Sequence, residues 1–144
     1  MKYRVSRATL LKLIGEALQS GEDFNEFRSF VLNRYYAEDE YIFESEGIEL
    51  IFDEVGAYLL DTEFAEDPFT SDRFRKLRKV FEAGGWTLEH VICALDYDRI
   101  TTLLDKYRSS AISVSVFDDQ IRKLSRADFD SSRLLEIYNQ GIIT

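Results

Sequence analysis

The stretch that decides the fold is EGIELIFDEVGAYLL, which covers residues 46–60. Its apolar side chains recur three, four and seven positions apart, which is the spacing of one face of an α-helix. The pattern therefore predicts an amphipathic helix from Glu46 to Leu60, with one face in the core. That face carries Ile48, Ile51, Phe52, Val55 and Leu59.

Helical spacing continues on both sides of this helix. Before it, a helix that ends at Gly21 is followed by one that Asp23 and Glu26 open as a variant of the capping box. After it, Ser71 and Thr87 stand where they can cap two further helices. The apolar positions of these and later helices are Leu10, Leu13, Ile14, Ala17 and Leu18; Phe24, Phe27, Val31 and Tyr35; Phe74, Leu77 and Phe81; Leu88, Val91, Ile92 and Leu95, continuing through Ile100, Leu103, Leu104 and Tyr107; Phe117, Ile121 and Leu124; and Leu134, Ile137 and Tyr138.

One stretch interrupts the helical spacing. In residues 112–116, isoleucine and valine alternate with serine, which is the period of a strand. A single short strand without a partner is not stable, so we interpret this stretch as an extended connector or the start of a helix. Beyond it, Asp130 or Ser131 can cap a last helix, which Gly141 stops.

The whole pattern predicts an all-α protein, a compact helical bundle of about six or seven helices. A chain of 144 residues fits a single domain, here residues 1–144, and Gly84-Gly85 is the one plausible subdomain break. The single cysteine, Cys93, excludes an internal disulfide and fits a reducing compartment. No apolar run is long enough to span a bilayer, and the N-terminal residues do not resemble a signal peptide, so we expect a cytoplasmic protein.

The charge of the chain is concentrated in one segment. The net charge is -9, and the segment from Tyr35 to Asp72 contains thirteen acidic residues and no Lys or Arg. We call these 38 residues the acidic segment. The parts before and after it are each slightly basic, so the acidic segment produces a localised negative field, which argues against nucleic acid as a partner.

Acidic side chains also occupy the outer face of the helix predicted over residues 46–60. Glu46, Glu49 and Asp53 lie on one face, away from the apolar stripe, and Glu54 follows them. Like charges at this spacing cost about 0.2–0.5 kcal/mol per pair, so helix stability does not explain them. Either solubility or a cationic partner does.

Three tyrosines flank the acidic run Glu38-Asp39-Glu40. Tyr35, Tyr36 and Tyr41 combine apolar area with a steering field, which is the composition of a binding surface. Two structural alternatives remain open. The run can be a solvated loop whose tyrosines fold onto the core, or the acids can pair with the basic residues Arg73, Arg75, Lys76, Arg78 and Lys79.

No motif of known chemistry is evident. His90 and Cys93 are the only histidine and cysteine, and two ligands do not make a zinc site. The pairs Asp96/Asp98 and Asp128/Asp130 lack the rest of a calcium loop and suit helix starts and turns better. We therefore expect no enzymatic activity, no catalytic residues, no cofactor and no metal.

Five short stretches in residues 9 to about 83 carry a resemblance to a known family. They are Leu10-Leu-Lys-Leu-Ile14, Ser20-Gly-Glu-Asp-Phe-Asn-Glu-Phe27, Glu49-Leu-Ile-Phe-Asp-Glu-Val55, Asp67-Pro68 and Leu77-Arg-Lys-Val-Phe81. With these stretches, the chain resembles the colicin D-like bacterial immunity proteins, including relatives from contact-dependent toxin systems. The resemblance implies an acidic helical protein that binds a basic ribonuclease toxin and covers its active site.

Together these observations predict a protein that blocks a cationic partner, a nuclease toxin of the ribonuclease kind, without contacting nucleic acid or membrane. Two alternatives stay open: an acidic adaptor or secretion chaperone with an apolar groove in residues 84–144, and an enzyme that uses clustered carboxylates with Mg²⁺. The sequence does not define the oligomeric state. The residues expected to bind the partner are Tyr35, Tyr36, Glu38, Asp39, Glu40, Tyr41, Glu46, Glu49, Asp53 and Glu54.

Overall fold

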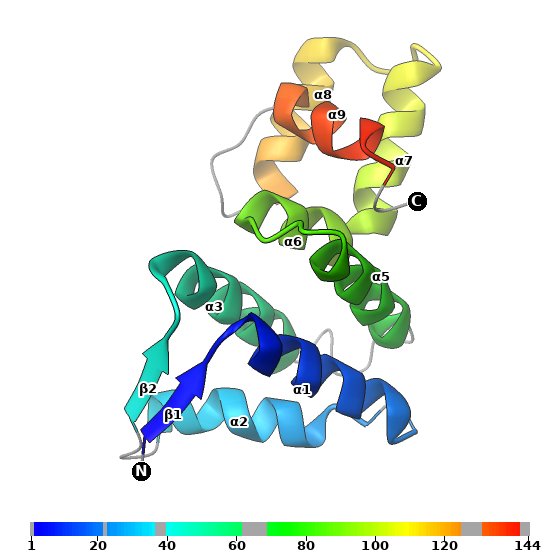
Figure 1. The fold of residues 1–144 in the computed structure, drawn as a ribbon. Coiled ribbons are helices and arrows are strands. Elements are labelled where there is room, and N and C mark those ends of the chain that lie inside the picture. The colour runs from blue at the N-terminus through cyan, green and yellow to red at the C-terminus, as the bar shows by residue number, and fades with distance from the viewer. Residues whose placement is uncertain (1, 22, 37–39, 62–68, 125–130, 142–144) are drawn as a thin grey trace.

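The computed structural model describes residues 2–21, 23–36, 40–61, 69–124 and 131–141, and most of these residues are helical. The described residues contain eight helices, one more than the upper expectation, and two short strands (Figure 1). None of the described helices is both long and apolar enough to cross a membrane. The elements are β1 (Lys2–Val5), α1 (Arg7–Gln19), α2 (Asn25–Tyr36), β2 (Glu40–Phe43), α3 (Glu46–Leu60), α5 (Thr70–Glu82), α6 (Leu88–Leu95), α7 (Tyr97–Arg108), α8 (Val114–Leu124) and α9 (Ser131–Asn139).

The predicted helix over residues 46–60 is confirmed as α3, with both its bounds and its buried face. Thr87 caps α6 as expected, since its hydroxyl accepts a hydrogen bond from the N–H of His90. One helix start differs from the prediction, because α5 begins at Thr70 after Phe69 and Ser71 lies inside it. The last helix, α9, begins at Ser131. Asp130, the other residue predicted to cap it, lies outside the described residues.

The expected long helix over residues 88–107 is two helices, α6 and α7, which meet at Asp96. Asp96 ends α6 with backbone angles outside the helical range. The side chain of Arg73, from α5, donates a hydrogen bond to the carbonyl of Leu95 and fixes the chain at this bend. A buried arginine from a distant helix leaves no trace in the apolar spacing, which is why the bend was not predicted.

The all-α prediction is wrong in one respect, because β1 and β2 form a two-stranded parallel sheet. The register pairs Lys2 with Glu40 and Val5 with Phe43. The strands are four residues long and 35 residues apart in sequence, and neither carries a hairpin signal. Within the described residues, the stretch at 112–116 pairs with no strand. It leads into α8 from Val114, which confirms the expected helix start.

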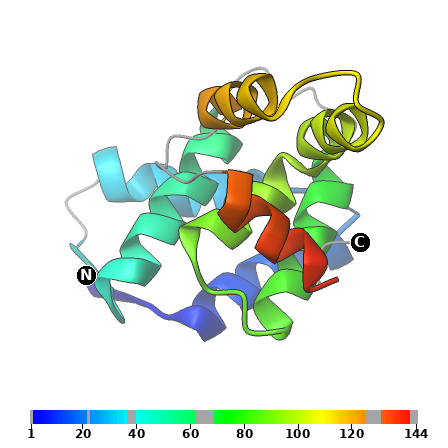
Figure 2. The ribbon, with the colours of Figure 1, turned by 90° about the horizontal axis from the view of Figure 1, so that it is seen from above.

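The core is built around α3 and α6. The last six residues of α6 are buried, because α5 and α3 cover one side of this helix and α7 and α9 the other. The strands, α1, α2 and α3 lie at one end of the molecule and α7 to α9 at the other (Figure 1). From above, α9 lies over α6 (Figure 2), with which it is in contact. This arrangement brings the end of α2, the strand β2 and the outer face of α3 together.

Candidate functional site

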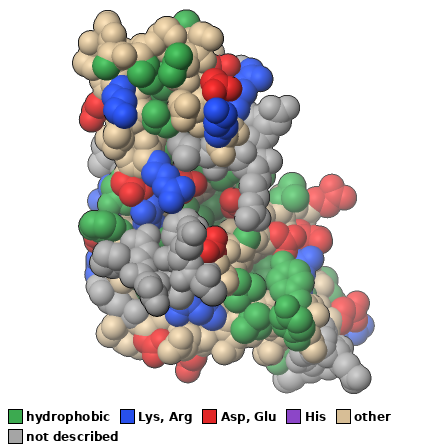
Figure 3. All heavy atoms as spheres, turned by 180° about the vertical axis from the view of Figure 1, so that it is seen from behind, with side chains coloured by type: hydrophobic (Ala, Val, Ile, Leu, Met, Phe, Trp, Pro, Cys, Tyr) green, Lys and Arg blue, Asp and Glu red, His purple; other side chains and the backbone are tan. Residues whose placement is uncertain are grey.

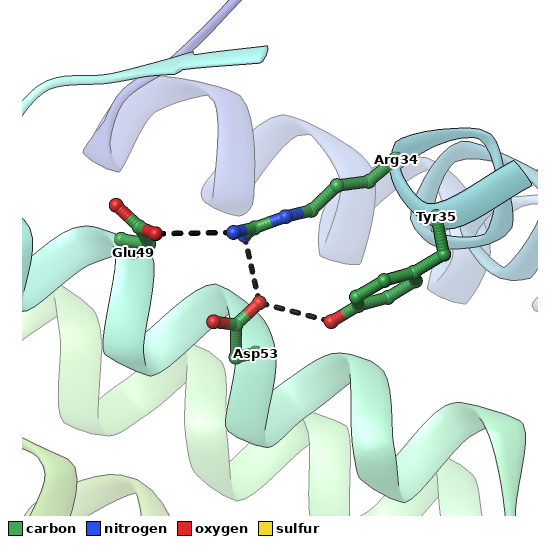
Figure 4. Close-up of polar contacts among 4 residues, drawn as sticks. All are labelled: Arg34, Tyr35, Glu49 and Asp53. Carbon is green, nitrogen blue, oxygen red and sulfur yellow. Dashed lines mark hydrogen bonds and ion pairs between the residues drawn. The ribbon is translucent and has the colours of Figure 1, made fainter. Parts of the chain in front are cut away.

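The candidate site lies where the last turn of α2 meets the outer face of α3. Arg34 of α2 donates one hydrogen bond to Oδ1 of Asp53, over 2.7 Å, and another to Oε1 of Glu49, over 3.1 Å (Figure 4). Glu49 and Asp53 are one helical turn apart, so the two ends of the guanidinium fork reach both carboxylates. One cation therefore holds both acids.

Aromatic rings surround the cation. The guanidinium carbon of Arg34 lies 4.5 Å from the ring centre of Phe43, 5.6 Å from that of Tyr35 and 5.9 Å from that of Phe52. Its side chain is only 20% exposed. A cation over aromatic faces and beside carboxylates gains from both contacts. Arg34 is thus an internal counter-ion in a mostly apolar setting.

This pairing corrects the expectation for the acids of α3. Glu49 and Asp53 are half-buried and paired. Of the three acids, only Glu46 is exposed and has no ion pair within the part of the chain that the structure describes. The repulsion that the sequence predicted along this helix is offset by a neighbouring helix. Arg34 is the last base before the acidic segment, and that position is the only sequence signal that pointed to it.

Tyr35 and Tyr36 end α2 on the surface, with 52% and 84% of each residue exposed. The hydroxyl of Tyr35 donates a hydrogen bond to Oδ1 of Asp53 over 3.0 Å. Partial burial and this bond to a carboxylate raise the pKa of Tyr35 above its ordinary value. Tyr35 is therefore held in place by Asp53, whereas Tyr36 is the most exposed large apolar side chain described here.

Tyr41 lies in a different setting from the other two tyrosines. Its ring packs against Tyr3, Phe30 and Phe52, with ring centres 5.0–6.1 Å apart, and its hydroxyl donates to the carbonyl of Phe30. These contacts join the sheet to α2 and α3. Tyr41 thus packs beneath the surface that Tyr35 and Tyr36 form. We had expected it to flank an acidic loop and to bind the partner directly.

The remaining predicted acids divide into three groups. Glu40 is exposed and forms an ion pair with Lys2, with 3.7 Å between Oε2 and Nζ. Glu54 is half-buried on α3. Glu38 and Asp39 lie outside the described residues. Seen from behind, apolar side chains with acidic ones beside them gather over this end of the molecule (Figure 3).

The basic helix α5 has its own partners. Arg73 is 4% exposed and forms a bidentate ion pair with Asp98. Its Nη1 lies 2.6 Å from Oδ1 and its Nη2 lies 3.0 Å from Oδ2. Burial raises the pKa of Asp98, but the hydrogen bonds and charge of Arg73 outweigh this and lower it below the ordinary value. Arg75 pairs with Asp72, the last residue of the acidic segment. Of the pairing that we considered between the acidic segment and this helix, the pair of Arg75 with Asp72 is an example, and both residues lie on α5.

The polar groups around α6 have structural roles. His90 is buried, and its ring nitrogens lie 2.6 Å from the Thr87 hydroxyl and 3.1 Å from the Gln140 side chain. Cys93 is a buried free thiol. Across the part of the chain that the structure describes, no three His, Cys, Asp or Glu side chains gather as metal ligands. Asp128 and Asp130 lie outside that part.

In comparisons with protein families, curated proteins and solved structures, nothing matches this chain. The charge, the exposed aromatics and the geometry around Arg34 are therefore the observations on which a function can be proposed.

Proposed function

We propose that this protein is an immunity protein, which binds a basic nuclease toxin of the ribonuclease class and blocks it. The toxin would meet the surface formed by Tyr35, Tyr36 and the exposed acids of β2 and α3. The observation that carries the proposal is the position of Tyr36, a highly exposed aromatic residue beside acids in a segment that contains no Lys or Arg. Such a side chain is a suitable anchor at the centre of an interface.

The charge balance at this surface supports a cationic partner. Five carboxylates, those of Glu40, Glu44, Glu46, Glu49 and Asp53, lie with three cations, Lys2, Arg4 and Arg34, on the described part of this surface. The local net charge therefore stays negative even after internal pairing. A ribonuclease must hold a phosphate backbone in a positive site, so clustered carboxylates can occupy the same site in place of phosphates.

The geometry adds preorganisation. Arg34 fixes Glu49 and Asp53, and Asp53 fixes the ring of Tyr35. Side chains that are ordered before binding lose less conformational entropy when the partner arrives. The long-range field would also speed association, with rate constants up to about 10⁸–10⁹ M⁻¹s⁻¹ at low salt. Both properties suit an inhibitor that must act before the toxin does.

The alternative, an adaptor or secretion chaperone, is favoured by a different observation. Val114 and Val116 of α8 are exposed, in the part of the chain where that alternative places an apolar surface. An apolar contact would respond weakly to salt, whereas a charge-driven complex weakens steeply as ionic strength rises. Salt dependence therefore separates the two proposals.

The test begins with capture of partners from lysate of the native host on the immobilised protein at low salt. Stepwise salt elution and mass spectrometry then identify what was bound, and a nuclease assay measures inhibition. We expect a basic protein of nuclease size, released at moderate salt, whose activity this protein abolishes at a 1:1 ratio. A partner that resists salt would overturn the inhibitor proposal in favour of the adaptor.

Three variants locate the surface. Tyr36→Ala and Glu46→Lys should weaken inhibition about tenfold or more, because each removes an exposed side chain that forms no ion pair or side-chain hydrogen bond within the described residues. Asp105→Lys is the matched control, since it makes the same charge change on an exposed position of α7, outside the acidic segment. If Glu46→Lys and Asp105→Lys weaken inhibition equally, inhibition depends on the net charge of the protein and not on this surface.

A further inference from the structure

Four exposed apolar side chains lie on the neighbouring helices α2 and α3. The described residues include eight large apolar side chains that are exposed, and half of them, Leu32, Tyr35, Tyr36 and Leu50, belong to these two helices. Leu50 is 56% exposed and Leu32 is 38% exposed. Single exposed apolar residues are common on protein surfaces, whereas a contiguous group marks an interaction site. What these four indicate therefore depends on whether they lie together.

The contacts between α2 and α3 show how the two helices lie. A Cβ at Gly56 would be 2.7 Å from Cγ1 of Val31, so the helices touch at this pair. Further along α2, the hydroxyl of Tyr35 donates to Asp53, which precedes Gly56 on α3. One helix is thus followed forwards as the other is followed backwards, and the two run antiparallel along one seam.

The four apolar side chains gather over the outer side of this seam. Leu32, Tyr35 and Tyr36 have the i, i+3, i+4 spacing of one face of α2. On α3, Leu50 and Asp53 are three residues apart on the outer face, and Asp53 holds the hydroxyl of Tyr35. Seen from behind, apolar side chains gather over this end of the molecule (Figure 3). We call Leu32, Tyr35, Tyr36 and Leu50 the seam strip.

Acidic side chains border the seam strip. The helices α2 and α3 together carry five acids and two bases, a sum of -3. Glu46 and Asp53 lie about one turn before and after Leu50. Both bases are engaged within the domain, since Arg34 pairs with two acids of α3 and Arg28 donates to a backbone carbonyl of that helix. The field at the strip is therefore negative, which favours a cationic edge on the segment that covers it.

The backbone beneath the strip decides what kind of segment fits. In the middle of α2 and α3, the backbone N–H and carbonyl groups are bonded within each helix. A segment that covers them finds no main-chain partner there, so it must satisfy its own backbone hydrogen bonds. An α-helix does so, and it also presents an apolar stripe with long basic side chains along its edges.

We propose that the seam strip receives an amphipathic, basic α-helix of the partner protein, with its apolar face on the strip and Lys or Arg beside the acids of α3. This inference rests on the proposed function for the partner being a basic protein, and it adds Leu32 and Leu50 to the binding surface. A second copy of this chain would bring the same acids against each other, which is unfavourable. The apolar contact would add affinity, and the acids would give the complex its dependence on salt.

The test uses a peptide of about 14 residues, or four helical turns, with leucine on one face and lysine on the other. A twin with alanine in place of leucine keeps the charge and the helix propensity. Calorimetry measures binding to the full chain, and amide shifts in NMR spectra locate the site. We expect the leucine peptide to bind about tenfold more tightly than its twin, with shifts on α2 and α3.

Three variants locate the helix site. Leu50→Ser should weaken binding of the leucine peptide about tenfold, and Leu32→Ser should weaken it as well. Both positions are exposed, so the substitutions should leave the fold intact. Val116→Ser, at an exposed apolar position of α8, is the matched control and should leave binding unchanged. With the captured toxin, Leu50→Ser should speed dissociation without altering the salt dependence of Kd.

Each other outcome overturns the helix site. Equal binding of the two peptides would mean that the surface attracts basic chains by charge alone, and absence of binding would mean that the strip takes no basic helix. Both results leave the inhibitor proposal standing, because capture from host lysate decides it separately. Loss of binding in Val116→Ser but not in Leu50→Ser would move the site to α8 and favour the adaptor. A dimer in solution that Leu50→Ser converts to a monomer would assign the strip to a second copy.

Discussion

The guanidinium of Arg34 and the carboxylate of Asp53 meet across the α2–α3 interface, with 2.7 Å between Nη1 and Oδ1. The same oxygen accepts the hydroxyl proton of Tyr35. This pair does two things at once, because it offsets repulsion along α3 and sets the position of an aromatic residue on the candidate surface. Substitution at Arg34 should therefore affect both stability and binding.

Replacing Arg34 with methionine should lower the free energy of unfolding by about 1–2 kcal/mol. The side chain keeps its apolar bulk, but Glu49 and Asp53 lose their shared cation in a half-buried setting. Urea unfolding at low salt measures the loss, which should shrink at high salt as the remaining repulsion is screened. The control is Arg122→Met, which removes an ion pair with Asp118 within one surface helix and should destabilise the protein much less. Equal effects of the two substitutions would contradict a special role for Arg34.

Gly56→Ala should destabilise the protein by about 1–2 kcal/mol, although alanine is the better helix former. A Cβ at Gly56 would lie 2.7 Å from Cγ1 of Val31, which is a stiff side chain on the facing helix α2. The cost should vanish in a Val31→Ala background, where the space is open. Thermal or urea unfolding of the double-mutant cycle measures this coupling, and strictly additive effects would argue against the close approach.

Asp96 should make the protein less stable as pH rises. Burial raises the pKa of Asp96 to about 6, more than the nearby Arg99 and Arg73 lower it. The folded state therefore keeps a proton between about pH 4 and 6 that the unfolded chain has already lost, so the free energy of unfolding falls across this window. At pH 7 the loss is nearly complete, at about 3 kcal/mol for a pKa raised from 3.8 to about 6.

Asp96→Asn tests this dependence. The variant should show a flatter profile between pH 4 and 6 and should be more stable than the parent at pH 7, because its side chain carries no charge to bury. Urea unfolding at several pH values provides both profiles. An unchanged slope in the variant would show that another group is responsible.

Cys93 should be inert in the folded protein. Burial, followed by the charges of Asp96 and Glu89, raises the pKa of its thiol to about 12. Because the thiolate is the reactive form, alkylation at pH 8 should be about 10³-fold slower than in denaturant. Mass spectrometry after iodoacetamide treatment gives both rates. Labelling of the native protein at nearly the denatured rate would place the thiol at the surface.

Local signals predicted the helices well. Apolar spacing gave α3 its bounds, and hydroxyl and glycine signals placed the start of α6 and the ends of α1 and α9, where Gly21 and Gly141 take the left-handed backbone conformation. These features depend on residues within one or two turns of each other. A single sequence records such contacts directly.

Contacts between distant segments were not predictable in the same way. The pairing of β1 with β2, the bend at Leu95 held by Arg73, and the capture of two acids by Arg34 all join residues at least 15 positions apart. The distribution of charged residues in the sequence defined the acidic segment. It could not show which of the carboxylates in that segment are paired with a base from a neighbouring helix. At Tyr41 the sequence showed an aromatic residue beside acids, and only the packing reveals that it supports the sheet from within.

The central position of α6 has a consequence for any attempt to divide the protein. This helix is buried between the N-terminal elements and α7 to α9, so each half uses it to complete its own interior. A fragment that ends at Gly84 would leave the apolar faces of α3 and α5 facing water, and a fragment that begins there would lack the surface on which α6 rests. The polypeptide should therefore melt as one cooperative unit, and its two halves should recover structure only when they are mixed.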